Sequence, residues 1–137
     1  MGRSLSIDVE QIGRTTSRAS ARSHELLVDR PREKDGEDRG PLGGELLLVA
    51  LAGCFMSTLL AAINTRSADV SNARVSATGT IGGVPERFES IELSVTATYQ
   101  DDELMRKLVE IAERGCLVTN TLKDAVRLSV AIEKSSS

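Results

Sequence analysis

Aromatic side chains are nearly absent from this sequence, which has no tryptophan, one tyrosine and two phenylalanines in 137 residues. Large rings usually supply much of the buried surface of a protein core. Alanine, leucine and valine must fill that role here. The length is that of one domain, and we predict a single domain over residues 1–137.

An excess of charge of one sign is also missing, because 17 Lys and Arg residues stand against 20 Asp and Glu residues, for a net charge of −3. No basic patch with interleaved aromatic residues occurs, so we expect no nucleic-acid partner. The single histidine, His24, and the two cysteines do not make up the three or four closely spaced ligands of a zinc site. We therefore predict no metal and no resident cofactor, and a structural or surface role for His24.

Cysteine is scarce as well, with only Cys54 and Cys116. No targeting segment is evident, so we expect a cytoplasmic protein whose thiols stay free unless redox chemistry uses them. A pair of cysteines in such a protein is often structural, because a free thiol packs well in a core.

One long apolar run stands out, from Leu46 to Ile63, with no charge and no proline. It is rich in leucine and alanine, which favour helix. Its apolar residues lie on every side, so the helix needs cover all round. A membrane span is the alternative, but Gly53, Ser57 and Thr58 dilute a run that only reaches the lower length limit. We predict a buried helix that is covered in a homo-oligomer, most simply a homodimer, with no membrane partner.

The rest of the chain predicts strands and two shorter helices. Alternation of apolar and polar residues predicts strands, and helical spacing behind Asp101 or Asp102 as N-cap predicts a helix that Gly115 ends. The expected strands cover residues 4–10, 15–21, 24–29, 73–78, 88–97 and 126–132, and the expected helices cover 45–66, with Glu45 in the first turn, 102–115 and 118–122. Strands and helices do not alternate regularly, which indicates an α+β fold with mostly antiparallel sheets.

The residues around the two cysteines change the interpretation of the thiols. The segment from Gly40 to Phe55, which contains Cys54, is GPLGGELLLVALAGCF, and the segment starting at Gly115 is GCLVTNTL. The first resembles the central-helix motif of the OsmC/Ohr family of thiol peroxidases, and the second resembles that family's second cysteine motif. The resemblance extends from about Ser4 to Glu133.

The resemblance implies an OsmC-like fold, in which antiparallel sheets wrap around a long buried central helix in an intertwined homodimer. It also implies a two-cysteine peroxidase for organic hydroperoxides. Cys54 would become a sulfenic acid, Cys116 would resolve it as a disulfide, and an external dithiol such as a dihydrolipoyl group would restore both thiols.

A reactive Cys54 must be a thiolate, and apolar burial opposes that. Peroxidases of the family use an arginine and a glutamate for activation. The resemblance places the glutamate at Gly44, one residue before Glu45, and places the arginine in a loop that holds Arg30, Arg32 and Arg39. Glu45 can substitute only if the helix begins after it or if it serves another subunit. Without an activating group, the same fold would be a non-catalytic binding or redox-sensing protein, which remains the alternative.

Overall fold

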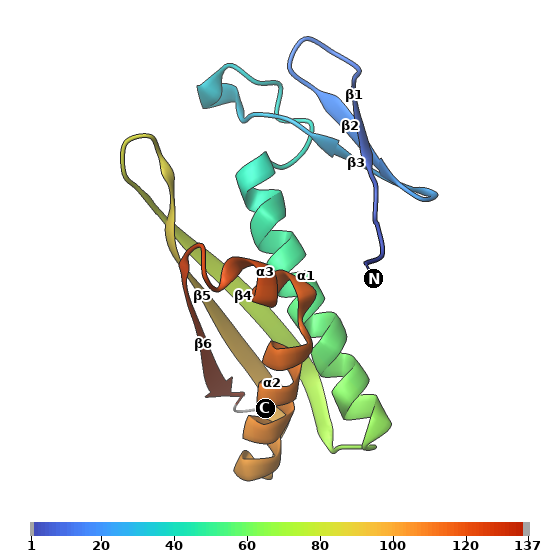
Figure 1. The fold of residues 1–137 in the computed structure, drawn as a ribbon, viewed down its shortest axis with the longest axis vertical. Coiled ribbons are helices and arrows are strands. Elements are labelled where there is room, and N and C mark those ends of the chain that lie inside the picture. Colours follow the sequence, from blue (N-terminus) through green and yellow to red (C-terminus); the bar gives the residue numbers. More distant parts are fainter. Residues whose placement is uncertain (1, 136–137) are drawn as a thin grey trace. The chain divides into compact units, whose positions relative to one another are not determined.

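The structure is a computed structural model that describes residues 2–135. It divides into two compact units, residues 1–47 and 48–137, and the long helix α1 (Gly43–Thr65) runs from the first into the second. Figure 1 shows the elements of each unit. The last two residues of the serine tail lie outside the described residues.

The first unit is built on a three-stranded antiparallel sheet. Its strands are β1 (Asp8–Gln11), β2 (Ser17–Ala21) and β3 (His24–Val28), in the order β1-β2-β3. A loop with the short 3-10 helix η1 (Arg32–Lys34) leads to α1. His24 is exposed at the start of β3, as expected for a surface residue.

The second unit holds a three-stranded sheet with the order β4-β5-β6. The strands β4 (Val70–Gly82) and β5 (Arg87–Tyr99) form the predicted antiparallel hairpin. The helices α2 (Asp102–Gly115) and α3 (Leu117–Leu122) then lead to β6 (Arg127–Lys134), which pairs with β5 in parallel. A parallel pair needs a long crossover connection, which α2 and α3 provide. The α+β class is confirmed, and the direction of β6 is the detail that alternation did not determine.

The core of the second unit lies between its sheet and its helices. In β5, every second residue from Ile91 to Tyr99 is buried, whereas the intervening residues are polar and less buried. The buried side chains of α1 and α2 pack in the same cluster, so both helices cover this face of the sheet. The buried residues of the two helices are Leu51, Phe55, Leu59, Ala62, Ile63, Met105, Leu108, Val109 and Ala112.

Only one side of α1 is buried by this chain. Val49, Leu60 and Leu47 on other sides of the helix are 61%, 44% and 39% exposed. Of the helices within residues 2–135, α1 alone is long and apolar enough to cross a membrane. The core helix of a soluble protein can have the same length and composition. The cover that an apolar surface of this size requires is thus supplied only in part by one copy of the chain.

The first predicted strand differs from expectation. The alternating residues Leu5, Ile7 and Val9 predicted a half-buried strand over 4–10, but they are 92%, 60% and 56% exposed, and β1 begins at Asp8. Alternation shows which side chains share a face of a strand. Burial of that face needs a second layer, and the described chain does not provide one here.

Candidate functional site: a pair of free thiols

The structure brings the two predicted cysteines together within the second unit. Cys54 lies in the middle of α1 and is half-buried, and Cys116 is fully buried between α2 and α3. Both thiols are free. The Cys116 side chain lies close enough to Cys54 to lower the pKa of the Cys54 thiol, so cysteines that are 62 positions apart in the sequence belong to one site.

Cys116 occupies a break between two helices. Its backbone is extended, with φ −84° and ψ 112°, so it ends α2 and serves as the N-cap of α3. Its sulfur accepts a hydrogen bond from the Thr119 N–H at 3.4 Å, and its carbonyl accepts one from the Asn120 N–H at 3.0 Å. The Asn120 side chain donates to the Arg114 carbonyl at 3.0 Å. The bond from Thr119 holds the Cys116 sulfur directly, and the other two bonds hold the backbone around it.

The environment of Cys54 favours its thiolate. Burial raises the pKa of the Cys54 thiol, but hydrogen bonds from the Val118 N–H, the Cys116 side chain and the Leu117 N–H together hold the pKa below its ordinary value. Hydrogen bonds to the charged form of a group lower the pKa of an acid. The sequence pattern did not identify these donors, because they are backbone groups that any residue provides.

The junction between α2 and α3 approaches α1 closely beside Cys54. The Thr58 hydroxyl on α1 donates to the Cys54 carbonyl at 3.1 Å, which orients its side chain. A Cβ atom added at Gly115 would lie 3.0 Å from the Thr58 methyl carbon, which is tighter than an ordinary contact. Glycine at position 115 therefore lets the segment that carries Cys116 come up to the helix that carries Cys54.

Glu45 has a local role in the first unit. The helix α1 begins at Gly43, before Glu45, so the condition that the helix starts after this residue is not met. The Glu45 carboxylate accepts a hydrogen bond from the Leu42 N–H at 2.8 Å. This is half of a capping box, and it satisfies an N–H group at the helix start. Support by Glu45 for another subunit stays a prediction.

The three candidate arginines all lie in the first unit. Arg30, Arg32 and Arg39 are exposed in the segment between β3 and α1. A buried carboxylate, Asp29, organises this segment: it is 3% exposed and accepts hydrogen bonds from the backbone N–H groups of Arg30 and Arg39 at 2.7 and 3.2 Å. The backbones of two of the three arginines are therefore fixed by one side chain.

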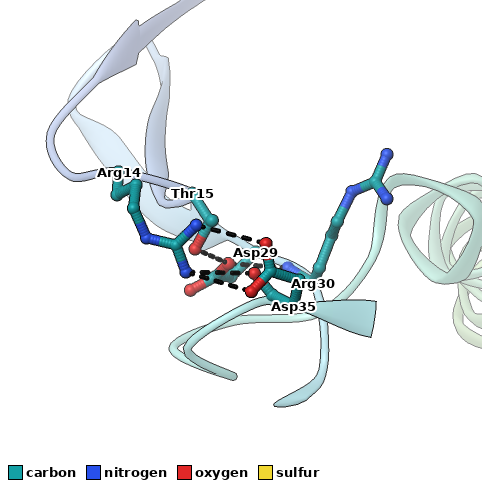
Figure 2. Close-up of polar contacts among 5 residues, drawn as sticks. All are labelled: Arg14, Thr15, Asp29, Arg30 and Asp35. Carbon is teal, nitrogen blue, oxygen red and sulfur yellow. Dashed lines mark hydrogen bonds and ion pairs between the residues drawn. The ribbon is translucent and has the colours of Figure 1, made fainter. Parts of the chain in front are cut away.

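Two threonines complete the environment of Asp29. The Thr15 and Thr16 hydroxyls donate to its two oxygens at 2.8 and 2.7 Å. Burial raises the pKa of Asp29, but the hydrogen bonds outweigh burial and hold the pKa well below its usual range. Figure 2 shows Thr15 turned toward Asp29, while the Arg30 side chain extends away from the carboxylates. Asp29 was not among the predicted site residues, although an aspartate at the end of an apolar strand is a visible signal in the sequence.

Residues 2–135 contain no group of side chains with the composition of a metal site. No three His, Cys, Asp or Glu side chains among them come together as a possible metal site. The two thiols themselves supply groups that can take part in redox chemistry. One thiol is partly accessible and inclined to ionise, and the other is buried beside it.

The fold and the thiol pair together define the class of protein. It is an α+β protein with one thiol in the long helix α1 and a second thiol at the junction between α2 and α3. The sequence model of the family described as OsmC-like protein matches residues 36–131. The chain therefore belongs to the OsmC-like family, as its cysteine motifs suggested.

Individual relatives support the same assignment. The protein YmaD of Bacillus subtilis (strain 168), described as uncharacterized, is 26% identical over 108 residues, which cover 73% of this chain and 72% of YmaD. A hypothetical protein of Aquifex aeolicus VF5 shares the fold with a TM-score of 0.83 at 17% identity, over 98% of both chains. An organic hydroperoxide resistance protein of Elizabethkingia anophelis has a TM-score of 0.75 at 18% identity, over 98% of this chain and 99% of that chain. At these identities the solved structures are evidence for the fold.

Proposed function

We propose that this protein is a thiol-dependent peroxidase that reduces organic hydroperoxides, with Cys54 as the attacking thiol and Cys116 as the resolving thiol. The observation that carries the proposal is the close packing of the Gly115–Cys116 segment against α1 beside Cys54, together with the lowered pKa of the Cys54 thiol. The similarity to solved organic hydroperoxide resistance proteins supports the same class of substrate.

The first step consumes the peroxide. The Cys54 thiolate attacks the terminal oxygen, the O–O bond breaks, and the alkoxide takes a proton from solvent and leaves as the alcohol. Cys54 is then a sulfenic acid, two electrons more oxidised than the thiol. The N–H groups of Leu117 and Val118, which favour the thiolate at rest, remain beside the sulfur during this step.

The second step forms a disulfide. Cys116 attacks the Cys54 sulfur, an S–S bond replaces the S–O bond, and the hydroxide released combines with the thiol proton to give water. An external dithiol, for which a dihydrolipoyl group is our proposal, then reduces the disulfide by two exchange steps. An apolar pocket around Cys54 would favour an organic peroxide over hydrogen peroxide.

The test uses cumene hydroperoxide with dihydrolipoamide as reductant. We expect turnover by the wild-type protein and none by Cys54→Ser. Without dithiol, Cys116→Ser should consume about one equivalent of peroxide and hold it as a sulfenic acid, because no intramolecular disulfide follows. Ser57→Ala is the matched control, since Ser57 is exposed on the same helix. Absence of turnover by the wild-type protein with any dithiol refutes the proposal.

One observation favours the alternative of a redox-sensing or binding protein. Position 44 is glycine, and the Glu45 carboxylate is engaged with the Leu42 N–H. In that case the two thiols form a reversible disulfide with peroxide without dithiol-dependent turnover. The experiment above separates the two functions, because a sensor stays oxidised at one equivalent of peroxide.

We also propose that the active protein is a cytoplasmic homodimer. The exposed apolar residues of α1 and of the N-terminal segment fit a second copy of the chain, and a reducing compartment keeps the thiols available. Sedimentation equilibrium measures the mass, and a monomer at micromolar concentration would contradict the dimer.

A further inference from the structure

Thr119 carries an unusual hydroxyl group. The residue is 2% exposed, and its Oγ1 atom has no hydrogen-bond partner among the described residues. Buried hydroxyl groups nearly always have a partner, and an orphan calls for an explanation. The neighbouring helix residue Thr121 shows the ordinary arrangement, because its hydroxyl donates to the Leu117 carbonyl at 2.9 Å.

The position of Thr119 explains what this hydroxyl can reach. Thr119 is the third residue of α3, and Cys116 is the N-cap. The Thr119 N–H already donates to the Cys116 sulfur at 3.4 Å. Side chains at this position of a helix point back toward the N-cap, which is the geometry of a capping box. Rotation of the threonine side chain between staggered positions therefore brings the hydroxyl toward the Cys116 sulfur.

We propose that the Thr119 hydroxyl donates a hydrogen bond to the Cys116 sulfur when Cys116 becomes a thiolate, which makes Thr119 a positioning residue for the resolving step. The proposal rests on the proposed peroxidase function, because only there does Cys116 act as a nucleophile. In the resting thiol the sulfur is a weak acceptor, and the hydroxyl has no partner. A charged sulfur is a strong acceptor, and the second donor then joins the backbone N–H.

The expected effect on reactivity depends on pH. A hydrogen bond to a charged group of this kind increases the thiolate fraction about tenfold. It also reduces the intrinsic nucleophilicity of the thiolate about threefold, because nucleophilicity follows basicity with a coefficient near ~0.45. Removal of the hydroxyl should thus slow the Cys116 reaction about threefold at neutral pH. It should speed the reaction about threefold once the thiol is fully ionised.

The experiment uses Cys54→Ser protein, in which Cys116 is the only thiol. The rate of reaction with the small reagent methyl methanethiolsulfonate is measured from neutral pH up to the alkaline plateau, with Thr119 intact, as Thr119→Val and as Thr119→Ser. We expect the valine variant to be slower at pH 7 and faster on the plateau, and the serine variant to behave as threonine does. Thr121→Val, which removes a hydroxyl from the same helix, should leave both rates unchanged.

Urea unfolding gives a second readout. Replacing an unpartnered buried hydroxyl by a methyl group of the same shape should leave stability equal or higher. A valine variant that changes the rate by the same factor at every pH, or not at all, overturns the proposal. A lower urea midpoint also overturns it, because the hydroxyl would then have a structural partner. None of these measurements requires peroxidase turnover, so failure of the proposed function is a separate result.

Discussion

Gly115→Ala tests how closely the two cysteine-bearing segments must pack. The added Cβ would lie 3.0 Å from the Thr58 methyl carbon, whereas ordinary carbon contacts begin near ~3.5 Å. The Thr58 side chain cannot rotate away without losing its hydrogen bond to the Cys54 carbonyl. Overpacking of this size costs about 1–3 kcal/mol. Alanine in place of glycine in a helix returns about 0.5–1 kcal/mol.

The expected net loss for Gly115→Ala is therefore between about 0 and 2.5 kcal/mol of unfolding free energy. Thr58→Ser removes the methyl group in question and keeps the hydroxyl that bonds to Cys54. In the Thr58→Ser background, Gly115→Ala should be stabilising by about 0.5–1 kcal/mol, because only the helix propensity remains. The double-mutant cycle should thus give a coupling energy of about 1–3 kcal/mol.

Urea unfolding of the reduced wild type, both single variants and the double variant measures this coupling. The rate at which Cys54 and Cys116 form a disulfide with diamide provides a parallel readout, and it should fall in Gly115→Ala and recover in the double variant. A coupling energy near zero would refute the argument, because the Thr58 methyl group would then not limit the approach of the two segments.

Three further predictions concern hydrogen bonds that the structure shows. Because the pKa of Asp29 is held below its usual range, its stabilising contribution is present above the unfolded value of about 3.9 and is lost as the pH falls. Asp29→Asn should therefore flatten the loss of stability between about pH 4 and pH 2 in urea titrations; an unchanged slope would contradict this. Asp101→Ala should lower the free energy of unfolding by about 1 kcal/mol in urea titrations. The reason is that the Asp101 side chain caps α2 by accepting a hydrogen bond from the Leu104 N–H at 3.0 Å. An equal loss in Asp102→Ala would argue against the cap. Cys116→Ala removes a hydrogen-bond donor to Cys54 and should raise the pKa of the Cys54 thiol. The thiolate absorbance at 240 nm should therefore appear at higher pH than in Cys116→Ser, which keeps a donor. Equal titration curves for the two variants would show that this donor is unimportant.

The local structure followed closely from the sequence. The apolar run with leucine and alanine predicted α1, and alternation predicted the β4–β5 hairpin. Asp101 and Asp102 were both predicted as possible N-caps, and Asp101 is the cap. These features depend on neighbouring residues in the chain, which a single sequence displays. The observed start of α1 at Gly43 lies two residues before the predicted start at Glu45, because the glycines before Glu45 indicated a loop.

Features that depend on distant residues were harder to predict. The exposure of Leu5, Ile7 and Val9 was contrary to expectation, and the parallel direction of β6 was not foreseen. Alternation carries no information on strand direction or on whether a second layer exists. Asp29 was overlooked because its importance comes from donors in two other segments of the chain.

The sequence by itself determined the helix and strand periodicities, the family and the two cysteines, because each is written in residue types at short spacing. Only the tertiary structure decided that the Cys116 side chain and two backbone N–H groups meet Cys54, since hydrogen-bond donors on the backbone have no residue-type signature. Tertiary structure likewise decided that the buried Thr119 hydroxyl finds no hydrogen-bond partner within residues 2–135. Both features arise because α1 and the α2–α3 junction, far apart along the chain, bury their apolar faces in one core.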